Sequence, residues 1–461
     1  MMGRYIRRKH ALSKIRGHAP APLDLAGRSR HFPRTMRDIT HPAERLVQAM
    51  ARIYQYRMTT TSGGNLSIRD DDGSIWITPA RVDKGSLRVE DIVRVLPDGS
   101  IEGRHKPSSE FPFHQMIYRE RPDLKAIVHA HPVALVAFSI CGQAPDTRLF
   151  TKARSVCGEA GFAPYALPGS ALLGERIAAV FAKGHDCVML ENHGVVVAGV
   201  DFPDAFRRFE TFEFVAKTVV KARALGEVRY LTDEQLAIGG GAGPQIEEFD
   251  PEPATSTEKA LRRELCDFIR RGYHQRLLTA NAGSFSVRVD DDSFLISTKL
   301  VDRATISPDQ LALIRGGKCE RGAQPSRAWQ LHRLIYQKHP EIRAIVNATP
   351  VNATAFSASA ARLDTRTIPE SYIFLRDVAV LPFSWVYDAP EKIAETMTPE
   401  FPIALIENDC ALVLGKTILD AFDRLEVLES TAEAVILSRS LGEVRPMGEE
   451  VIDELVQAFL S

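Results

Sequence analysis

The 461-residue sequence has few cysteines, no long hydrophobic run and almost no net charge. Its 6 cysteines include no C-x-x-C pair and no framework spacing, which indicates reduced, mostly buried thiols in a cytoplasmic protein. No stretch approaches the roughly 18 apolar residues of a membrane span. The formal net charge of -1 argues against nucleic acid or a membrane surface as a partner of the whole molecule. We therefore expect a globular protein, and the length predicts two or three domains.

The first 40 residues differ from the rest. Arginine and lysine are frequent there, prolines are scattered among them, and acidic residues are almost absent. Such a segment buries too little apolar surface to fold alone, so we expect a disordered basic tail. An arginine-rich targeting presequence and a wrongly assigned start codon are the alternatives.

Beyond this segment the chain carries the same pattern twice. Residues 225–229 (LGEVR) recur as residues 441–445, and residues 126–128 (AIV) recur as residues 344–346. The offset stays between about 216 and 219 residues along the chain. The sequence therefore predicts a tandem duplication of one domain.

A linker separates the two copies. Residues 238–257 contain glycine, proline and acidic residues without any apolar periodicity. We expect one domain at residues 41–237 and a second at residues 258–461, each of ordinary domain size.

Two histidines in the first copy suggest a metal site. His129 and His131 follow the apolar segment 126–128, and side chains at i and i+2 of a strand point to the same face. Imidazole suits Zn²⁺ and its first-row neighbours, and catalytic zinc takes three protein ligands and an open position. His193 could supply a third ligand, and Glu110 is a carboxylate placed to join them.

The second copy serves as an internal control on this interpretation. All four candidate groups are lost together, although the surrounding apolar pattern persists, so we expect no such metal site in the second copy. The replacements are Asn347 for His129, Thr349 for His131, Asp409 for His193 and Ala328 for Glu110.

Three polar residues persist in both copies, and we interpret them as structural for that reason. They are His114 with His332, Tyr118 with Tyr336, and Asp83 with Asp302.

The motifs together resemble the class II aldolase/adducin family over both copies. The family pattern of a Ser-Gly-Asn turn, Ser-Ser-Glu, His-x-His and Asn-His-Gly is met at residues 62–67, 108–110, 129–132 and 192–194. The resemblance implies an α/β fold: two tandem α/β/α three-layer domains, each with a mainly antiparallel central sheet. It also implies sites at the subunit interfaces of a fourfold ring, which two tandem chains would form as a homodimer.

The resemblance also assigns roles to residues of the first copy. His129, His131 and His193 look like ligands of one Zn²⁺ (or Mn²⁺, Co²⁺ or Fe²⁺) per chain, and Glu110 looks like the acid–base residue. A pocket for the anionic group of the substrate is expected from Ser62, Gly63, Gly64, Asn65, Ser108 and Ser109, with Arg81 as a further anion-binding candidate. Tyr372 of the second copy lies about where family members donate a tyrosine to a neighbouring site.

These expectations favour a metal-dependent lyase. It would perform aldol cleavage or decarboxylation of a small anionic hydroxy-carbonyl compound, a sugar phosphate or a hydroxy-acid, through a metal-stabilised enediolate. An epimerase or dehydratase on the same site is an alternative. An adducin-like binding or scaffold protein without chemistry is a second alternative, favoured by the degenerate second copy.

Overall fold

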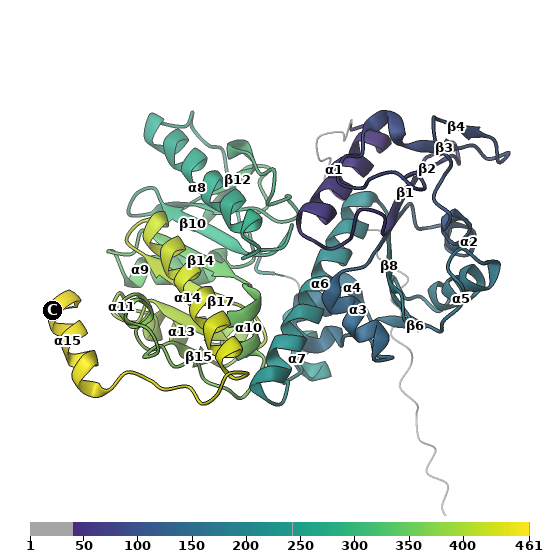
Figure 1. The fold of residues 1–461 in the computed structure, drawn as a ribbon. Helices are drawn as coiled ribbons and strands as arrows, with labels where there is room; N and C mark the ends of the chain where they lie inside the picture. The colour runs from purple at the N-terminus through teal and green to yellow at the C-terminus, as the bar shows by residue number, and fades with distance from the viewer. Residues whose placement is uncertain (1–39, 242, 461) are drawn as a thin grey trace, which may run out of the picture. The chain divides into compact units, whose positions relative to one another are not determined.

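The structure, a computed structural model, describes residues 40–241 and 243–460 (Figure 1). Apart from Thr40, the predicted basic tail lies outside the described residues. The described residues from Pro42 onward form one compact unit. Among the described helices, none combines the length and the apolar character needed to cross a membrane.

One sheet of eight strands organises the first half. The strands are β1 (Asn65–Arg69), β2 (Ile75–Ile77), β3 (Val93–Val95), β4 (Ile101–Glu102), β5 (Ala126–Ala130), β6 (Gly161–Ala163), β7 (Cys187–Leu190) and β8 (Gly194–Gly199). Their order in the sheet is β4-β3-β2-β1-β5-β8-β7-β6. Neighbouring strands are antiparallel except β6 and β7, which are parallel.

Helices cover both faces of this sheet (Figure 1). They are α1 (Pro42–Gln55), α2 (Phe111–Glu120), α3 (Val133–Ile140), α4 (Thr151–Cys157), α5 (Ala171–Phe181), α6 (Phe202–Leu225) and α7 (Asp233–Gly240). One apolar cluster joins α2 and α5 to the sheet, and another joins α1, α3, α4 and α6 to the opposite face. In β8, Val195 and Val197 belong to the second cluster and Val196 to the first, as the alternation of strand side chains requires. The predicted three-layer fold is confirmed.

The second half repeats this arrangement around nine strands. They are β9 (Glu248–Phe249), β10 (Ser284–Arg288), β11 (Ser293–Ser297), β12 (Leu311–Arg315), β13 (Lys318–Glu320), β14 (Ala344–Ala348), β15 (Ala379–Leu381), β16 (Ile403–Ile406) and β17 (Ala411–Gly415). Their order is β15-β16-β17-β14-β10-β11-β12-β13-β9, and only the outermost pair at each edge is parallel. The sheet is therefore mainly antiparallel, as predicted.

Helices lie on both faces of the second sheet as well, and a last helix without buried residues lies apart from the sheet (Figure 1). They are α8 (Ser256–His274), α9 (Trp329–Lys338), α10 (Val351–Ser357), α11 (Pro369–Leu375), α12 (Trp385–Asp388), α13 (Pro390–Thr396), α14 (Ile418–Ser438) and α15 (Glu449–Phe459). Helices α8, α10, α11 and α14 share one apolar cluster with the sheet, and α9 and α13 share the other.

The predicted linker is partly built into the second sheet. Residues 238–257 contain the end of α7, all of β9 and the start of α8. Strand β9 pairs in parallel with β13, so this segment adds an edge strand rather than running free.

Helix α6 of the first half packs against the second half. Its buried Ala222 and Leu225 belong to the main apolar cluster of the second half. The fully buried carboxylate of Glu210 accepts hydrogen bonds from the Tyr273 hydroxyl at 2.6 Å, the Ala280 amide at 2.8 Å and the Arg276 guanidinium at 3.1 Å. A buried charge with three donors would be left unpaired if the halves parted, so the second half is an integral part of the chain's fold.

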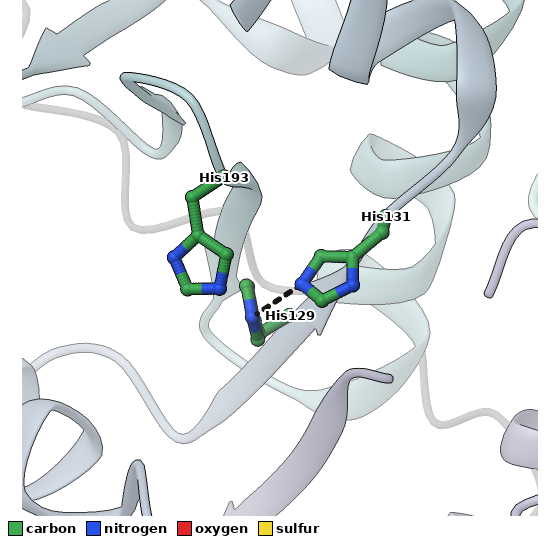
Figure 2. Close-up of side chains that lie close together, drawn as sticks. All are labelled: His129, His131 and His193. Carbon is green, nitrogen blue, oxygen red and sulfur yellow. Dashed lines mark hydrogen bonds between the residues drawn. The ribbon is translucent and has the colours of Figure 1, made fainter. Parts of the chain in front are cut away.

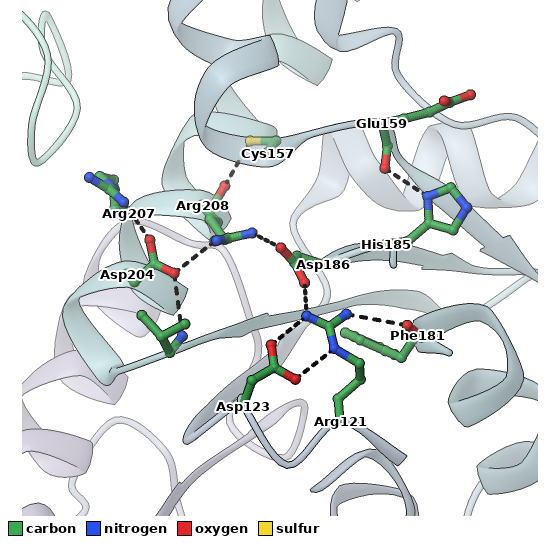
Figure 3. Close-up of polar contacts among 11 residues, drawn as sticks. Arg121, Asp123, Cys157, Glu159, Phe181, His185, Asp186, Asp204, Arg207 and Arg208 are labelled. Atoms are coloured by element: carbon green, nitrogen blue, oxygen red, sulfur yellow. Dashed lines mark hydrogen bonds and ion pairs between the residues drawn. The ribbon is translucent and has the colours of Figure 1, made fainter. Parts of the chain in front are cut away.

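An ion-pair network holds the beginnings of β5 and β7 (Figure 3). Arg121 pairs with Asp123, just before β5, at 2.7 Å and with Asp186, just before β7, at 3.2 Å. Arg208 of α6 also pairs with Asp186 and reaches Asp204 at 3.0 Å. Both strands are antiparallel to β8, so they run in the same direction and end at the same edge of the sheet. The network therefore fixes two strands at the end opposite to the histidines.

Candidate functional site

Three histidines converge where β5 and β7 end (Figure 2). His129 is in β5, His131 follows that strand by one residue, and His193 lies in the turn between β7 and β8. One ring nitrogen from each lies within 4.8 Å of the others. The expectation that His129 and His131 point to the same face is met, since their Nε2 atoms are 3.1 Å apart.

The His129 ring is oriented by the backbone. Its Nδ1 lies 2.9 Å from the carbonyl oxygen of Val195 and donates its hydrogen there. This bond leaves Nε2 directed at the other histidines, which is the arrangement that metal-ligating histidines usually adopt. His193 Nδ1 is buried, and no hydrogen-bond partner for it exists in the described part of the chain.

Glu110 completes the cluster. Its Oε2 lies 3.2 Å from His129 Nε2, and its Oε1 lies 3.5 Å from His193 Nε2. Glu110 occupies the N-cap position of α2, but its side chain makes no capping hydrogen bond. The side chain is therefore directed into the site, and a role as a pure capping residue is not supported.

Burial and the charges within the cluster set its protonation. Burial would raise the pKa of Glu110, but the charge and hydrogen bond of His129, with the charge of His193, lower it below the usual range. Burial, followed by the charge of His129, lowers the pKa of His131 to about 3 and that of His193 to about 4. Both rings are thus neutral at pH 7, which is the form that binds metals.

The residues present fit a divalent metal ion. Three imidazole nitrogens and a carboxylate form a donor set typical of zinc and its first-row neighbours. Ligand nitrogens of a tetrahedral zinc site lie about 3.3 Å apart, close to the 3.1 Å between the Nε2 atoms of His129 and His131. Glu110 Oε1 is buried and lacks a hydrogen-bond partner among the described residues. A buried polar atom without a partner is expected where the atom binds a metal ion or a substrate.

Behind Glu110 lies a continuous hydrogen-bonded chain. Asn65 Nδ2 donates to Glu110 Oε2 at 2.8 Å, and Asn65 Oδ1 lies 2.5 Å from His114 Nε2. His114 Nδ1 lies 2.7 Å from the Ser67 hydroxyl, which lies 2.8 Å from the Tyr118 hydroxyl. His114 and Tyr118 are buried and satisfied, so their interpretation as structural residues agrees with their surroundings. His114 also orients the amide that holds Glu110.

The third retained pair, Asp83 and Asp302, supports equivalent turns. The Asp83 carboxylate accepts from the Gly85 amide at 2.9 Å, and the Asp302 carboxylate accepts from the Ala304 amide at 2.9 Å.

The glycine turn lies against the histidines. Gly64 has φ +72°, and a Cβ there would lie 2.7 Å from the His129 carbonyl oxygen. A Cβ on Gly63 would lie 2.9 Å from His131 Nδ1, and one on Gly194 would lie 2.5 Å from His131 Cδ2. Glycine at positions 63 and 194 leaves room for the His131 imidazole, and glycine at position 64 leaves room for the backbone of His129.

The other members of the predicted anion pocket surround this turn. Ser62 and Ser109 are exposed, and the buried Ser108 hydroxyl accepts from the Glu110 amide at 3.3 Å. Asn65 donates to Glu110, a role that the sequence did not suggest. That these residues bind an anion stays a prediction.

Arg81 sits in a left-handed backbone conformation at φ +58°. Leu300 occupies the matching position of the second half with the same φ, so this conformation belongs to the fold. Among the described residues, the Arg81 guanidinium has no hydrogen-bond partner and no ion pair, which leaves it available to an anion.

In the second half, the position that corresponds to His129 is occupied by Asn347, which is not a typical metal ligand. Asn347 Oδ1 lies 2.5 Å from His332 Nε2, and Asn347 Nδ2 donates to Cys410 Sγ at 3.4 Å. Within residues 40–241 and 243–460, the three histidines of the first half are the one cluster of potential metal ligands found.

Tyr372 of the second half and Lys152 of the first half are candidates to contribute to a site outside their own half. Tyr372 lies in α11, half-buried, and contacts no predicted site residue of the first half through a described hydrogen bond. Lys152 of α4, which sequence reasoning missed, donates to the Asn281 carbonyl oxygen 129 positions away. No sequence pattern marks such a residue, because the contact depends on how the two halves pack.

The chain is similar in sequence to known proteins. A family model described as the class II aldolase and adducin N-terminal domain matches residues 44–220 and again residues 263–436. A 3-oxo-tetronate 4-phosphate decarboxylase of Pectobacterium atrosepticum is 36% identical over 199 residues, covering 42% of this chain and 89% of the relative. An L-fuculose phosphate aldolase of Methanocaldococcus jannaschii is 32% identical over 179 residues, covering 38% of this chain and 93% of the relative. A solved L-fuculose 1-phosphate aldolase is 28% identical with a TM-score of 0.40, covering 43% of this chain and 93% of that structure.

Proposed function

Because the chain belongs to the class II aldolase and adducin family, we propose that its first half is the catalytic domain of a divalent-metal-dependent carbon–carbon lyase. The predicted class of enzyme is confirmed at the level of the family, since the relatives are named as aldolases and decarboxylases. The substrate is a small anionic hydroxy-carbonyl compound, either a sugar phosphate or a hydroxy-acid.

One observation carries this proposal. A carboxylate that makes no capping bond lies within 3.5 Å of two histidines that are themselves part of a three-imidazole cluster. A scaffold protein would have no need for a buried carboxylate oxygen without a hydrogen-bond partner.

The metal site holds one ion per chain. His129, His131 and His193 would bind it, with Zn²⁺ as the first choice and Mn²⁺, Co²⁺ or Fe²⁺ as alternatives. When bound, the ion supplies a Lewis acid for the substrate carbonyl.

The protein's own residues do the remaining work. Glu110 accepts or returns the proton at its carboxylate, and Asn65 keeps that carboxylate facing the histidines. The turn of Ser62, Gly63 and Gly64, together with Ser108, Ser109 and Arg81, binds the anionic group of the substrate.

Aldol cleavage and decarboxylation are the two leading reactions, since the relatives named above perform one or the other. Epimerisation and dehydration use the same proton-moving carboxylate and are the next candidates. The adducin-like scaffold is the alternative without chemistry.

A substrate screen tests the proposal. Zinc-loaded protein is incubated with sugar phosphates and with keto or hydroxy-acids, while aldehyde and CO₂ release are measured separately. We expect turnover of a member of one class and its loss in Glu110→Gln. Absence of turnover with every compound and every divalent metal, by a protein that holds one ion per chain, would favour the scaffold.

The second half completes the assembly. In the described chain, Asn408 Nδ2 donates to the carbonyl oxygens of Leu149 and Arg229, each at 2.9 Å, so a loop of the degenerate site docks on the first half. Asn192 has the same left-handed backbone, with φ +52° against +48° for Asn408, but its side chain is exposed whereas Asn408 is buried. These observations support a homodimer in which Asn192 docks on the second half of another chain. Catalytic and degenerate sites would then alternate around a pseudo-fourfold ring. Tyr372 of that half is the candidate donated residue.

We further propose that the second half is a pseudoenzyme domain, that residues 41–237 and 258–461 are the two domains, and that the protein acts in carbohydrate metabolism. A cytoplasmic location agrees with six free cysteines, of which only Cys141 is exposed.

A further inference from the structure

A cavity of about 680 Å³ opens on the second half, between three segments of the chain. The segments are the first turns of α8, the 3₁₀ turn Pro308–Gln310, and the end of β13 with the residues that follow it. The lining shares no residue with the candidate metal site or with the matching positions of the second half. The volume lies within the range of roughly 300–1,000 Å³ that is usual for ligand pockets. The cavity is therefore a separate place with room for a small organic molecule.

Arg262 is the buried residue of this lining, and it joins the three segments. Its Nε pairs with Glu258 Oε1 at 2.8 Å, and its Nη2 pairs with Glu320 Oε2 at 2.9 Å. Its Nη1 donates to the carbonyl oxygens of Pro308 at 3.2 Å and Leu311 at 3.1 Å. One guanidinium thus holds all three walls, so the shape of the cavity is set before a ligand binds.

Two exposed cations of α8 line the cavity without a partner of opposite charge. Lys259 and Arg263 are four residues apart and therefore lie on the same face of the helix. Arg263 Nε donates to the Lys259 carbonyl oxygen at 3.2 Å, which directs the guanidinium back toward Lys259. Within the described part of the chain, neither side chain forms an ion pair. Arg321, another cation of the lining, pairs with Asp250 at 2.5 Å, so the charge available to a ligand comes from α8.

One carboxylate of the lining is free as well. Asp309 of the 3₁₀ turn is exposed and forms no ion pair with any residue that the structure describes. Its oxygens accept hydrogen bonds from hydroxyl groups and repel a second negative charge. The lining has four cations against two carboxylates, so the cavity stays positive while it offers this acceptor.

The first half lacks the two free cations at the matching positions. Thr40 corresponds to Lys259, and Glu44 corresponds to Arg263. Because both halves adopt the same fold, the fold itself does not require a positive charge at either place. The duplication thus separates these cations from the needs of packing.

From these observations we propose that the cavity binds a small organic anion, with a phosphate or carboxylate head between Lys259 and Arg263 and a hydroxyl-bearing body against Asp309. An anionic head supplies the charge-assisted hydrogen bonds that the two cations lack. The proposal is independent of the metal and of the reaction proposed for the first half.

Equilibrium dialysis of full-length protein with labelled glycerol 3-phosphate, and separately with labelled glycerate, counts the molecules bound per chain. Lys259→Thr with Arg263→Glu installs the residues of the first half at two exposed positions. We expect this double variant to weaken one class of binding sites at least about tenfold, because two charge-assisted contacts are lost and a negative charge is added. Any binding at the candidate metal site should be unchanged.

The matched control is Arg119→Glu with Lys183→Thr, which changes the net charge equally at exposed positions of the first half. It should leave binding unchanged. Asp309→Ala tests the contact with the body of the ligand and should lower the preference for glycerol 3-phosphate over inorganic phosphate. An unchanged preference would contradict that contact.

The two probes separate the head groups. Weakening for glycerol 3-phosphate alone assigns a phosphate head, weakening for glycerate alone assigns a carboxylate head, and weakening for both assigns a site for either head. The proposal is overturned if the double variant binds both probes as the wild type does. It is also overturned if the control variant weakens binding equally, since the effect would then come from net charge and not from the cavity.

Discussion

His332 in the second half holds Asn347 through a 2.5 Å contact between Nε2 and Oδ1, as His114 holds Asn65 in the first half. Asn65 lies on β1 directly opposite His129 of β5, and the equivalent pair is Ser284 of β10 opposite Asn347 of β14. The buried histidine of each half therefore contacts a side-chain amide from a different strand. In the first half this amide lies on β1, and in the second half it lies on β14. In the first half this leaves the β5 position free for a metal ligand.

The first prediction concerns metal content. Purified protein should hold one tightly bound divalent ion per chain, because the described second half contains no comparable ligand cluster. His129→Ala should release the ion, since it removes the central imidazole, whereas His332→Ala should retain it. Mass spectrometric metal analysis checks this, and close to two ions per chain would refute it.

Glu110→Gln isolates proton transfer. Glutamine keeps the size of the side chain and an oxygen that can accept from Asn65, but it cannot take up a proton. We expect retained metal and fold, with kcat lower by roughly two to four orders of magnitude. Steady-state kinetics on metal-loaded protein measure this, and turnover at the wild-type rate would place the base elsewhere.

Asn65→Ser tests the chain of hydrogen bonds behind the carboxylate. The shorter side chain leaves His114 without its acceptor and Glu110 without its amide donor. We expect a loss of about 1–3 kcal/mol in unfolding free energy and a fall of about 10- to 100-fold in kcat. Ser284→Asn in the second half is the control and should leave kcat unchanged. Equal kcat in both variants and the wild type would contradict the positioning role.

The buried histidines predict acid sensitivity. Burial lowers the pKa of His332 from its usual 6.5 to about 4, and that of His114 to about 3. The unfolded chain therefore takes up protons first, so the stability from each histidine is full above pH 6.5 and falls as pH drops from 6.5 toward the folded pKa. Each histidine should cost about 1.4 kcal/mol per pH unit in that window.

Denaturant midpoints at pH 7, 6 and 5 measure this slope. His332→Gln removes the titrating group, so its midpoint should fall less steeply with pH than that of the wild type. Parallel curves for the two proteins would show that another group governs the acid transition.

Assembly is tested at Asn192. Light scattering should show a dimer, and Asn192→Ala should shift it toward monomer because the exposed side chain is the proposed docking group. Asn408→Ala should lower the melting temperature of the single chain without changing its mass, since Asn408 is bonded within the chain. A monomeric wild type, with full activity in a chain truncated at residue 240, would refute the ring.

The sequence predicted those parts of the site that follow local rules. The spacing of His129 and His131 sets their common face, because strand side chains alternate, and the duplication marked His193 and Glu110 by their joint loss. Asn65 was expected to bind an anion, but its contact with Glu110 depends on how α2 packs against β1.

Contacts between distant segments were not predictable in the same way. Lys152 reaches the second half only because the halves pack together, and Arg121 joins Asp123 to Asp186 only because β5 and β7 begin at the same edge. Such contacts leave no periodicity or spacing in the sequence, since each depends on the tertiary arrangement.

Gly194 limits the evolutionary routes back to a second metal site. A Cβ at this position would lie 2.5 Å from Cδ2 of His131, and the second half carries Cys410 there. Introducing histidine at Thr349 while Cys410 remains would therefore produce a steric overlap, and Cys410→Gly alone would remove the sulfur that Asn347 contacts. Each of these substitutions alone carries a cost, so a second metal site of this kind needs both changes together.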